Sequence, residues 1–388
     1  MQKDIYIWGA GKYGDMAYIR YKDDCNIRGY LDSMPEKWGT IKNGLPVYAP
    51  DVLKEKPAAV VVAVKDHEGI EKRLQEEYEV PGIFLFSCVE EAVHDSADAG
   101  PGGGELEKNS VIIHYSGGLG NQMFQYALMK HFLLKKDTVY ADISYYRLAE
   151  GGIFQLTEVF RNIHIKTCNA GQKYRLAKRY LDGDIEGRFS IDSEIKYETD
   201  HAVLNMETGF IKGLHQNYYF PSLIREELLK DFQFDLTADG QLKKMCDSMG
   251  AQNNIVGVHI RRGDYLSDKY RQALGDVCTE AYYNRAMEYM EQRAGRCQFY
   301  FFSDDIEWVK EHYQRSDALY IESSMFDSYQ SWFDMCLMSF CSHHIIANST
   351  YSWWGAWLNP REKIVIAPET WARTKNFADI CPAEWIRM

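Results

Sequence analysis

The sequence predicts an α/β protein with parallel, doubly wound sheets, and three observations support this fold class. Apolar, strand-like runs alternate with helical patterns along the chain. A glycine-rich turn joins a strand to a helix in two places, at residues 9–14 and 116–122. Three strand ends in the last third of the chain carry polar clusters. Since ligands of open parallel sheets bind beyond the carboxyl ends of the strands, these clusters are the first place to look for function.

Residues 1–93 are predicted to form a small, separate Rossmann-like domain of the nucleotide-binding type. The strand Asp4–Trp8 leads into Gly9-Ala10-Gly11-Lys12-Tyr13-Gly14 and a helix, and a second strand, Ile27–Leu31, ends at Asp32. This order of strand, glycine turn, helix, strand and acid is typical of dinucleotide folds. The tight strand-to-helix turn alone also explains the glycines, without any nucleotide. The remaining elements expected here are the strands Ala58–Val64 and Gly82–Phe86 and the helix Glu68–Tyr78.

Residues 94–109 are predicted to be a flexible, solvated linker, because they are rich in glycine and lack apolar periodicity. A second glycine turn, Ser116–Gln122, follows the strand Val111–Tyr115 and precedes the helix Met123–Leu134. Backbone amides at such a turn can bind an anion, and Asn121 and Gln122 offer side-chain amides to a ligand. A simple helix cap is the alternative role of Asn121.

A predicted buried strand, Ile255–Ile260, is followed directly by Arg261-Arg262-Gly263-Asp264. Two guanidinium groups suit a diphosphate, because their planar forks bind phosphate oxygens bidentately. Strand alternation places His259 and Arg261 on one side and Arg262 on the other. One arginine can therefore face a ligand while the other holds the loop, with Asp264 as a partner. A surface salt-bridge turn is the alternative.

Strands and helices alternate from this strand to the C-terminus. The expected strands are Cys297–Phe302, Leu319–Glu322, His343–Ala347 and Ile364–Ala367, and the expected helices are Thr279–Arg293, Ser328–Cys341 and one opened by Asn348–Ser352. Polar clusters follow three of the strands, at 261–264, 303–305 and 348–350. In one parallel sheet these ends meet at one edge, so we expect the clusters to converge. The segment 138–236 is less regular, with a strand at Val139–Ile143 and a strand-to-turn element at Ile211–Phe220.

Composition limits the classes of function. The formal net charge of −12 argues against nonspecific nucleic-acid binding and makes the arginine pair a local positive site on an acidic protein. No apolar run approaches the length that spans a bilayer, and the first residues lead straight into a strand without a signal peptide. The nine cysteines are scattered and lack metal-ligand spacing, which indicates reduced thiols and a cytoplasmic location.

The motifs resemble those of a known family. His259–Tyr265 resembles the arginine motif of GDP-fucose-dependent α-1,2- and α-1,6-fucosyltransferases and protein O-fucosyltransferases. Three further stretches are similar to the α-1,2-fucosyltransferases in particular: Gly117–Ala127, Phe302–Trp308 and Ile346–Asn359. The resemblance covers about residue 111 to the C-terminus, with all four motifs in the family's order. The first hundred residues lie outside it.

The resemblance implies a two-lobed, GT-B-like glycosyltransferase with two Rossmann-like lobes after the small N-terminal domain. Residues 110–240 are then the acceptor-side lobe and residues 241–388 the GDP-fucose-binding lobe. The implied reaction is inverting transfer of L-fucose from GDP-β-L-fucose to the 2-hydroxyl of a terminal galactoside, with no metal and no other cofactor. The implied partners are GDP-fucose and a galactose-terminated glycan in polysaccharide biosynthesis, with at most peripheral membrane contact and no nucleic acid. The sequence indicates no oligomeric state.

The family pattern also suggests residue roles. Arg261 stabilises the departing diphosphate, Arg262 holds the loop or assists, and Asn121 reaches toward donor or acceptor. The other residues expected to bind the donor are Gly118, Gly120, His259, Asp304, Asp334, Ser349 and Thr350. Within this set, Ser349 and Thr350 match residues that bind the diphosphate, and Asp334 matches an acid that contacts the nucleoside. Asp264 is either the general base or a structural partner of the arginines.

Two other functions stay open. One is a nucleotide-sugar oxidoreductase that uses the glycine turn at residues 9–14, and the other is a noncatalytic nucleotide-sugar-binding protein. The oxidoreductase lacks a Tyr-x-x-x-Lys pair in a suitable place in the first domain. It also leaves the C-terminal motifs unexplained.

Overall fold

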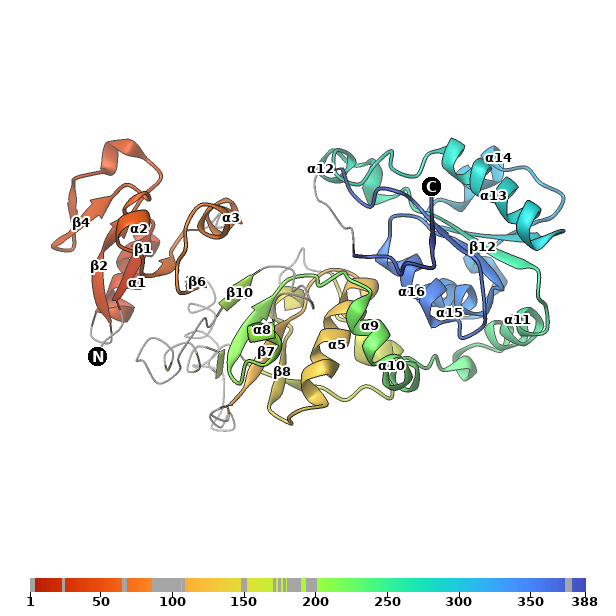
Figure 1. Cartoon of the computed structure of the whole chain (residues 1–388), viewed down its shortest axis with the longest axis horizontal. Coiled ribbons are helices and arrows are strands. Elements are labelled where there is room, and N and C mark those ends of the chain that lie inside the picture. Colours follow the sequence, from red (N-terminus) through yellow and green to blue (C-terminus); the bar gives the residue numbers. More distant parts are fainter. Residues whose placement is uncertain are drawn as a thin grey trace. The chain divides into compact units, whose positions relative to one another are not determined.

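The computed structural model contains three sheets, which follow one another along the chain (Figure 1). It describes residues 4–22, 25–64, 68–85, 106, 109–147, 152–169, 172–173, 176, 179, 190–192, 201–373 and 379–388. The expected linker, 94–109, lies outside these residues except for Leu106 and Asn109. The expected α/β fold class with Rossmann-like sheets is confirmed.

The first sheet has six strands in the order β3-β4-β2-β1-β5-β6, and only the β3–β4 pair is antiparallel. Its strands are β1 (Asp4–Trp8), β2 (Asn26–Leu31), β3 (Ile41–Lys42), β4 (Leu45–Tyr48), β5 (Ala59–Val62) and β6 (Ile83–Leu85). Its helices are α1 (Lys12–Tyr21), α2 (Val52–Glu55) and α3 (Glu68–Glu76). The four expected strands are present. The short β3 and β4 were not expected, because two to four residues give too little pattern to recognise.

The second sheet has five parallel strands in the order β10-β11-β7-β8-β9. They are β7 (Val111–His114), β8 (Val139–Asp142), β9 (Lys166–Thr167), β10 (Ser190–Asp192) and β11 (Gly209–Lys212). The associated helices are α5 (Leu119–Leu133), α6 (Leu156–Val159), α8 (His201–Leu204), α9 (Tyr219–Leu223) and α10 (Arg225–Asp231). The chain order reverses between β7 and β11, which makes the carboxyl ends of these two strands a topological switch point.

The third sheet has six parallel strands in the order β14-β13-β12-β15-β16-β17. They are β12 (Ile255–Ile260), β13 (Gln298–Ser303), β14 (Ala318–Tyr320), β15 (His343–Ile345), β16 (Val365–Ala367) and β17 (Ile386–Arg387). The helices are α11 (Gly240–Gly250), α12 (Asp268–Arg271), α13 (Glu280–Ala294), α14 (Ile306–His312), α15 (Phe333–Phe340) and α16 (Thr350–Leu358). Single 3-10 turns occur at Pro35–Lys37, Ser144–Arg147, Leu236–Ala238, Asp264–Leu266 and Ser323–Met325.

Most elements of the third sheet follow the pattern predicted from the sequence. Every residue of β12 is buried, as expected for a central strand covered on both faces. Thr279 caps α13 by accepting from the amide of Tyr282, and Asp305 caps α14 by accepting from that of Trp308. The cap at Thr279 agrees with the predicted start of this helix. Helix α15 is shorter than expected because residues 328–332 are not helical, and β17 was missed because it has only two residues.

The chain divides into two compact units. Unit 1 comprises residues 1–116, 129–151 and 165–213, and unit 2 comprises residues 117–128, 152–164 and 214–388. Unit 1 contains the first two sheets, and unit 2 contains the third. The boundaries expected at 93, 109 and 240 stay predictions.

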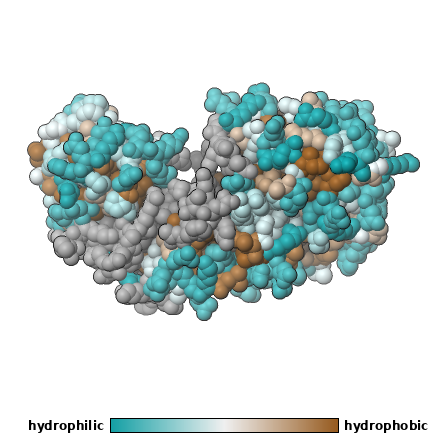
Figure 2. Space-filling model, in the orientation of Figure 1, coloured by the Kyte–Doolittle hydropathy of each residue, from teal (hydrophilic) through white to brown (hydrophobic). Residues whose placement is uncertain are grey.

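Hydrophilic residues predominate on the described surface seen in Figure 2, with hydrophobic residues in a few patches. Among the described residues, no helix combines the length and apolar character that crossing a bilayer requires. The described cysteines are all free thiols, and seven of the eight are buried, in keeping with the small core residues expected of reduced cysteines.

Candidate functional site

The polar clusters meet at the topological switch point of the third sheet. The chain runs from β12 outward to β13 and β14, and then returns to β15 on the other side of β12. Arg261 follows β12, and Ser349 and Thr350 follow β15, so they flank the position where the strand order reverses. Ligands of doubly wound sheets bind in this crevice. All eleven residues predicted for the site belong to unit 2.

Arg261 is held by two carboxylates. Its Nε and Nη2 lie 3.0 and 2.8 Å from Asp264 Oδ1, and its Nη1 lies 3.1 Å from Asp304 Oδ2. The side chain keeps 34% of its surface exposed. Since Nη1 and Nη2 each carry two N–H groups, each retains one that is not directed at these carboxylates. The guanidinium is therefore fixed in orientation and still able to bind an anion.

Arg262 has a different environment. Its guanidinium carbon lies 3.6 Å from the centre of the Trp308 ring, and its Nε donates to Asp305 Oδ2 over 3.1 Å. Cation–π stacking and this hydrogen bond anchor the side chain against the first turn of α14. The two arginines thus divide as strand alternation predicts. Arg262 holds the loop, whereas Arg261 keeps unused donors.

Asp304 organises the turn that follows β12. Its Oδ1 accepts the backbone amide of Arg262 over 2.9 Å, while its Oδ2 pairs with Arg261. A Cβ at Gly263 would lie 2.4 Å from Asp304 Oδ2, so glycine is needed for this close approach. The carboxylate predicted to bind the donor is therefore engaged with the arginine loop, and it positions Arg261.

The expected positive site needs correction. Asp264, Asp304 and Asp305 surround the two arginines within hydrogen-bonding distance. Their three negative charges exceed the two positive ones, so an anion must compete with or share these carboxylates. The favourable potential for an anion has to come from additional groups, and the start of α16 supplies them.

Helix α16 begins at this edge with unused donors. Ser349 is its N-cap residue and makes no side-chain capping bond, although only 7% of it is exposed. The first amides of a helix lack intrahelical acceptors, and the helix dipole favours negative charge there. The Ser349 hydroxyl lies at the same end, whereas the Thr350 hydroxyl already donates to Asn121 Oδ1. The diphosphate-binding role of these residues stays a prediction, and the free amides at the start of α16 are compatible with it.

Asn121 lies within the first turn of α5, which begins at Leu119, so it is not the helix cap. Its Oδ1 accepts from Thr350 Oγ1 over 3.0 Å and from Gln216 Nε2 over 2.9 Å. Its Nδ2 donates to no acceptor within the described part of the chain and remains available to a ligand. The side chain is thus tied directly to the start of α16.

The two glycines of this loop differ. A Cβ at Gly120 would lie 2.6 Å from the carbonyl carbon and Oγ1 of Thr350, so Gly120 permits the start of α5 to pack against the start of α16. The Gly120 carbonyl also accepts from Trp354 Nε1 over 2.9 Å. A Cβ at Gly118 would meet nothing within 4 Å. Gly118 therefore leaves open space, whereas Gly120 serves helix packing.

Gln122 does not offer its amide to a ligand, and this expectation was wrong. Its Nε2 donates to the carbonyls of Gly117 and Ile153, and its Oε1 accepts the amides of Gln155 and Leu156, all over 3.0 Å. The residue is fully buried. Sequence alone could not show that this loop would supply both pairs of partners.

Two buried polar atoms near Tyr351 lack partners. His259 Nδ1 and Asp334 Oδ1 are both buried without a hydrogen bond to any described residue. The His259 ring centre lies 5.9 Å from that of Tyr351, whose hydroxyl accepts the backbone amide of Met335, the residue after Asp334. Buried polar groups in proteins usually have hydrogen-bond partners, so these two atoms are candidates for contact with a ligand.

Burial controls the charge of both groups. Burial, followed by the positive charge of Arg261, lowers the pKa of His259 to about 3, so the imidazole is neutral. Burial raises the pKa of Asp334 to about 7, although a hydrogen bond from Tyr329 acts in the opposite direction. A carboxyl poised near neutrality can ionise when a ligand presents N–H donors to it.

Two residues of the motifs have structural roles that sequence reasoning did not assign. The Asn348 Nδ2 donates to the carbonyls of Leu274 and Trp371, both over 3.0 Å. The Tyr265 hydroxyl donates to the Asn348 carbonyl over 2.8 Å. These bonds join the loop after β12 to the loop after β15. The position of Asn348 directly before Ser349 was the available signal.

Tryptophans of α16 are core residues. Trp353 is fully buried, packs 4.6 Å from Phe124 between ring centres, and donates to the Ile380 carbonyl. Because it is fully buried, Trp353 cannot stack on a sugar. Tyr218 is only partly buried and stacks on Tyr219 at 4.3 Å between ring centres.

At the glycine turn of the first sheet, the hydrogen-bonding groups of Asp32 are already paired with residues of the same domain. Asp32 Oδ2 accepts from the Ala10 amide and from Lys37 Nζ, both over 2.9 Å, and Oδ1 accepts the Met34 amide. A Cβ at Gly9 would lie 2.5 Å from the Ala63 carbonyl oxygen. The acid that would bind a ribose is thus engaged within the domain, and close backbone packing accounts for Gly9.

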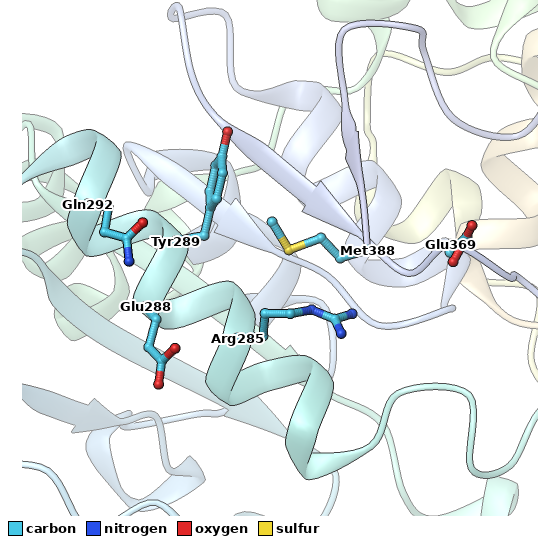
Figure 3. Close-up of a pocket in the computed structure, with 6 residues that line it drawn as sticks. All are labelled: Arg285, Glu288, Tyr289, Gln292, Glu369 and Met388. Carbon is cyan, nitrogen blue, oxygen red and sulfur yellow. The ribbon is translucent and has the colours of Figure 1, made fainter.

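A cavity of about 460 Å³ lies beside α13, and none of the residues predicted for the site lines it (Figure 3). It is lined by Arg285, Glu288, Tyr289, Gln292, Glu369 and Met388. Its side chains of mixed charge do not indicate one class of ligand. No group of three or more His, Cys, Asp or Glu side chains that could hold a metal occurs among the residues described.

Comparison with known proteins identifies the class. Residues 105–388 match the description "Glycosyl transferase family 11", so the part of the chain that carries the site is a glycosyltransferase. The chain belongs to glycosyl transferase family 11. Residues 1–104 lie outside the match, in agreement with an additional N-terminal domain.

Curated relatives support this membership. The chain is 31% identical over 303 residues to an alpha-1,2-colitosyltransferase of Escherichia coli, covering 72% of this chain and 98% of the relative. It is 29% identical to the O-antigen biosynthesis glycosyltransferase WbnK of Escherichia coli, covering 70% and 98%. It is also 26% identical over 167 residues to human galactoside alpha-(1,2)-fucosyltransferase 1, covering 40% of this chain and 45% of the human protein.

Among solved structures, NodZ alpha-1,6-fucosyltransferase co-crystallized with GDP is similar at 14% identity and a TM-score of 0.42. The similarity covers 67% of this chain and 96% of NodZ.

Proposed function

We propose that the protein transfers L-fucose from GDP-β-L-fucose to the 2-hydroxyl of a terminal galactoside, with inversion at the anomeric carbon and without a metal. The observation that carries this proposal is the meeting of Arg261 and the start of α16 at the switch point of the third sheet. Family membership and a human relative named as a galactoside alpha-(1,2)-fucosyltransferase support the reaction.

The chemistry follows from the charge that develops. Cleavage of the bond between fucose and the β-phosphate oxygen leaves negative charge on the diphosphate and positive charge on the sugar. Arg261 and the first amides of α16, with Ser349 and Thr350, are positioned to stabilise the departing diphosphate. Asp334 and His259 are assigned to the nucleoside, because both hold unpaired buried polar atoms.

The transfer also needs a group that accepts the proton of the acceptor hydroxyl, and Asp264 is the candidate. Asp264 Oδ1 already accepts from Nε and Nη2 of Arg261, and this arrangement favours a structural role over that of a general base. The proposed mechanism therefore depends mainly on stabilisation of the departing diphosphate. Asp264→Asn is expected to lower turnover by about tenfold, as expected for a positioning residue, and not to abolish it.

A donor carrying colitose is the second candidate. The observation that favours it is the 31% identity, over 72% of this chain, to an alpha-1,2-colitosyltransferase. A polysaccharide setting fits the similarity to an O-antigen biosynthesis glycosyltransferase. We propose that a colitose donor carrying guanosine diphosphate would use the same diphosphate site.

The test is to incubate the full chain with GDP-fucose and lactose and to measure GDP and fucosylated lactose. We expect α-linked product and an unchanged rate after addition of EDTA, and GDP-colitose serves as the competing donor. Arg261→Ala should lower turnover at least about a hundredfold, because a leaving-group donor is lost. Near-normal turnover in this variant contradicts the assignment of Arg261, and strict dependence on a divalent cation contradicts the metal-free mechanism.

A further inference from the structure

A polar cluster in unit 1 lies at the switch point of the second sheet. His114 is the last residue of β7, which pairs with β8 on one side and with β11 on the other. The chain order reverses between β7 and β11, so His114 emerges where ligands of doubly wound sheets bind. None of the roles assigned above uses this residue.

The imidazole is oriented by a buried carboxylate. His114 Nδ1 lies 2.9 Å from Asp142 Oδ2, and Asp142 is the last residue of β8. The Asp142 side chain is only 3% exposed, and it also accepts from Lys173 Nζ over 2.9 Å and from the Ser144 amide over 3.2 Å. These bonds, led by the one from His114, hold the pKa of Asp142 well below its usual range in spite of its burial. An ionised Asp142 can only accept, so Nδ1 is the donor of this bond, and in the neutral imidazole Nε2 is a hydrogen-bond acceptor.

The second ring nitrogen of His114, Nε2, is available to a ligand. His114 Nε2 makes no hydrogen bond to any residue that the structure describes, and 14% of the side chain is exposed. The ring centre lies 6.4 Å from that of Tyr145 and 6.1 Å from that of Phe210. A lone-pair acceptor between aromatic rings matches a sugar, which presents hydroxyl donors and apolar C–H faces.

A purely structural ion pair is the alternative. Lys173 already supplies a positive partner for Asp142, so a partly exposed histidine is not needed to neutralise the carboxylate. The arrangement of a buried acid, an imidazole and an open Nε2 instead resembles the way proteins orient a histidine toward a hydroxyl.

We propose that His114 is an acceptor-binding residue whose Nε2 accepts a hydrogen bond from a hydroxyl of the acceptor saccharide, with Asp142 as its positioning residue. This inference rests on the proposed function. It assigns His114 no role in donor binding.

The experiment compares His114→Ala and His114→Gln with the control His164→Gln in the full chain. His164 is an exposed histidine outside any site described above. Both His114 variants should lower kcat/KM for lactose by about tenfold, which is the loss of one good hydrogen bond. GDP affinity, measured by calorimetry, should stay within about twofold of the parent protein. Imidazole added to His114→Ala should restore part of the lactose-dependent rate.

The outcomes separate the two proposals. If the parent protein neither binds GDP-fucose nor fucosylates lactose, the proposed function fails. If the parent is active and folded His114→Gln keeps kcat/KM for lactose within about twofold, only the role of His114 fails. A parallel loss of GDP affinity and lactose turnover in His114→Gln also overturns the inference, since it shows a structural role. If His114→Ala does not fold, His114→Gln decides.

Discussion

Adjacent residues on one strand end have separate roles in this protein. Arg261 and Arg262 differ by one position, and alternation along β12 sends their side chains to different partners. Arg261 lies between Asp264 and Asp304 with part of its surface open, while Arg262 stacks on Trp308. The guanidinium that is still free to bind an anion is therefore the one predicted to meet the diphosphate.

Arg262→Ala should affect stability more than chemistry. The variant loses a stacked cation–π contact and a hydrogen bond to Asp305, so we expect a loss of about 1–2 kcal/mol in the free energy of unfolding. Urea unfolding checks this value, with Arg293→Ala, an exposed arginine on α13, as the control. Turnover should fall less than in Arg261→Ala. A larger loss of turnover in Arg262→Ala than in Arg261→Ala reverses the assigned roles.

Asp334 should make stability depend on pH. Burial raises its pKa to about 7, whereas the carboxyl of an unfolded chain titrates near about 4. Between these values the folded protein binds more protons than the unfolded chain, so the free energy of unfolding falls as the pH rises through this window. Asp334→Asn should remove this contribution. Urea unfolding at pH 5 and pH 8 tests it, with exposed Asp247→Asn as the control, and equal slopes in the parent and Asp334→Asn contradict it.

The same carboxyl should couple donor binding to pH. If the ionised Asp334 accepts hydrogen bonds from the nucleoside, GDP affinity should rise from pH 6 to pH 8 as the carboxyl ionises. Calorimetry in two buffers of different ionisation enthalpy should detect proton release at pH 6. Asp334→Asn should show weaker binding that no longer varies with pH. A parent protein with pH-independent GDP affinity and no proton release excludes this role.

At the scale of elements, the first turns of α5 and α16 pack against each other. Gly120 lies against the Thr350 backbone, Trp354 donates to the Gly120 carbonyl, and Asn121 accepts from Thr350. Both helix starts carry residues predicted to bind the donor. Their mutual packing therefore sets the position of the Thr350 and Asn121 side chains.

Gly120→Ala and Gly118→Ala should separate packing from binding. An alanine at 120 would place Cβ 2.6 Å from Thr350 atoms, so we expect a loss of about 1–3 kcal/mol in the free energy of unfolding together with reduced turnover. An alanine at 118 meets nothing within 4 Å, and stability should be unchanged. Calorimetric GDP affinity of Gly118→Ala then reports whether a ligand approaches this glycine. A stable, fully active Gly120→Ala contradicts the packing argument.

At the scale of the whole molecule, the predicted donor site and the additional N-terminal domain are separate in sequence. The match to glycosyl transferase family 11 begins at residue 105, and the predicted donor residues extend from Gly118 to Thr350 within unit 2. The first sheet closes its own glycine turn through Asp32. Nothing in this arrangement requires the first sheet for donor binding.

Deletion of residues 1–100 should therefore leave GDP affinity within about threefold of the parent protein, a difference below 1 kcal/mol. Circular dichroism first establishes that the truncated chain is folded, and calorimetry then measures GDP binding. Asp32→Ala in the full chain is the matched point variant and should also bind GDP normally. A folded truncation that has lost GDP binding shows that the N-terminal domain contributes to the site.

Sequence reasoning succeeded where local pattern decides the outcome. Strand β12, the start of the helix at Thr279, and the alternation of Arg261 and Arg262 all follow from residues that are neighbours in the chain. It failed where partners are distant. Gln122 was expected to face a ligand, but three of its four hydrogen bonds involve residues more than thirty positions away. The positive charge after β12 is offset by Asp304 and Asp305.

The order of residue types along the chain determined the α/β class, the parallel sheets and the family, because periodicity, glycine turns and motif order are properties of the chain itself. Only the tertiary structure decided which polar groups are already satisfied. Asp304 pairs with Arg261, and buried Gln122 hydrogen-bonds to backbone groups of two loop segments. His259 Nδ1 and Asp334 Oδ1 have no hydrogen-bond partner among the described residues. Hydrogen bonding depends on distances of about 3 Å between residues far apart in sequence, and folding alone brings such groups together.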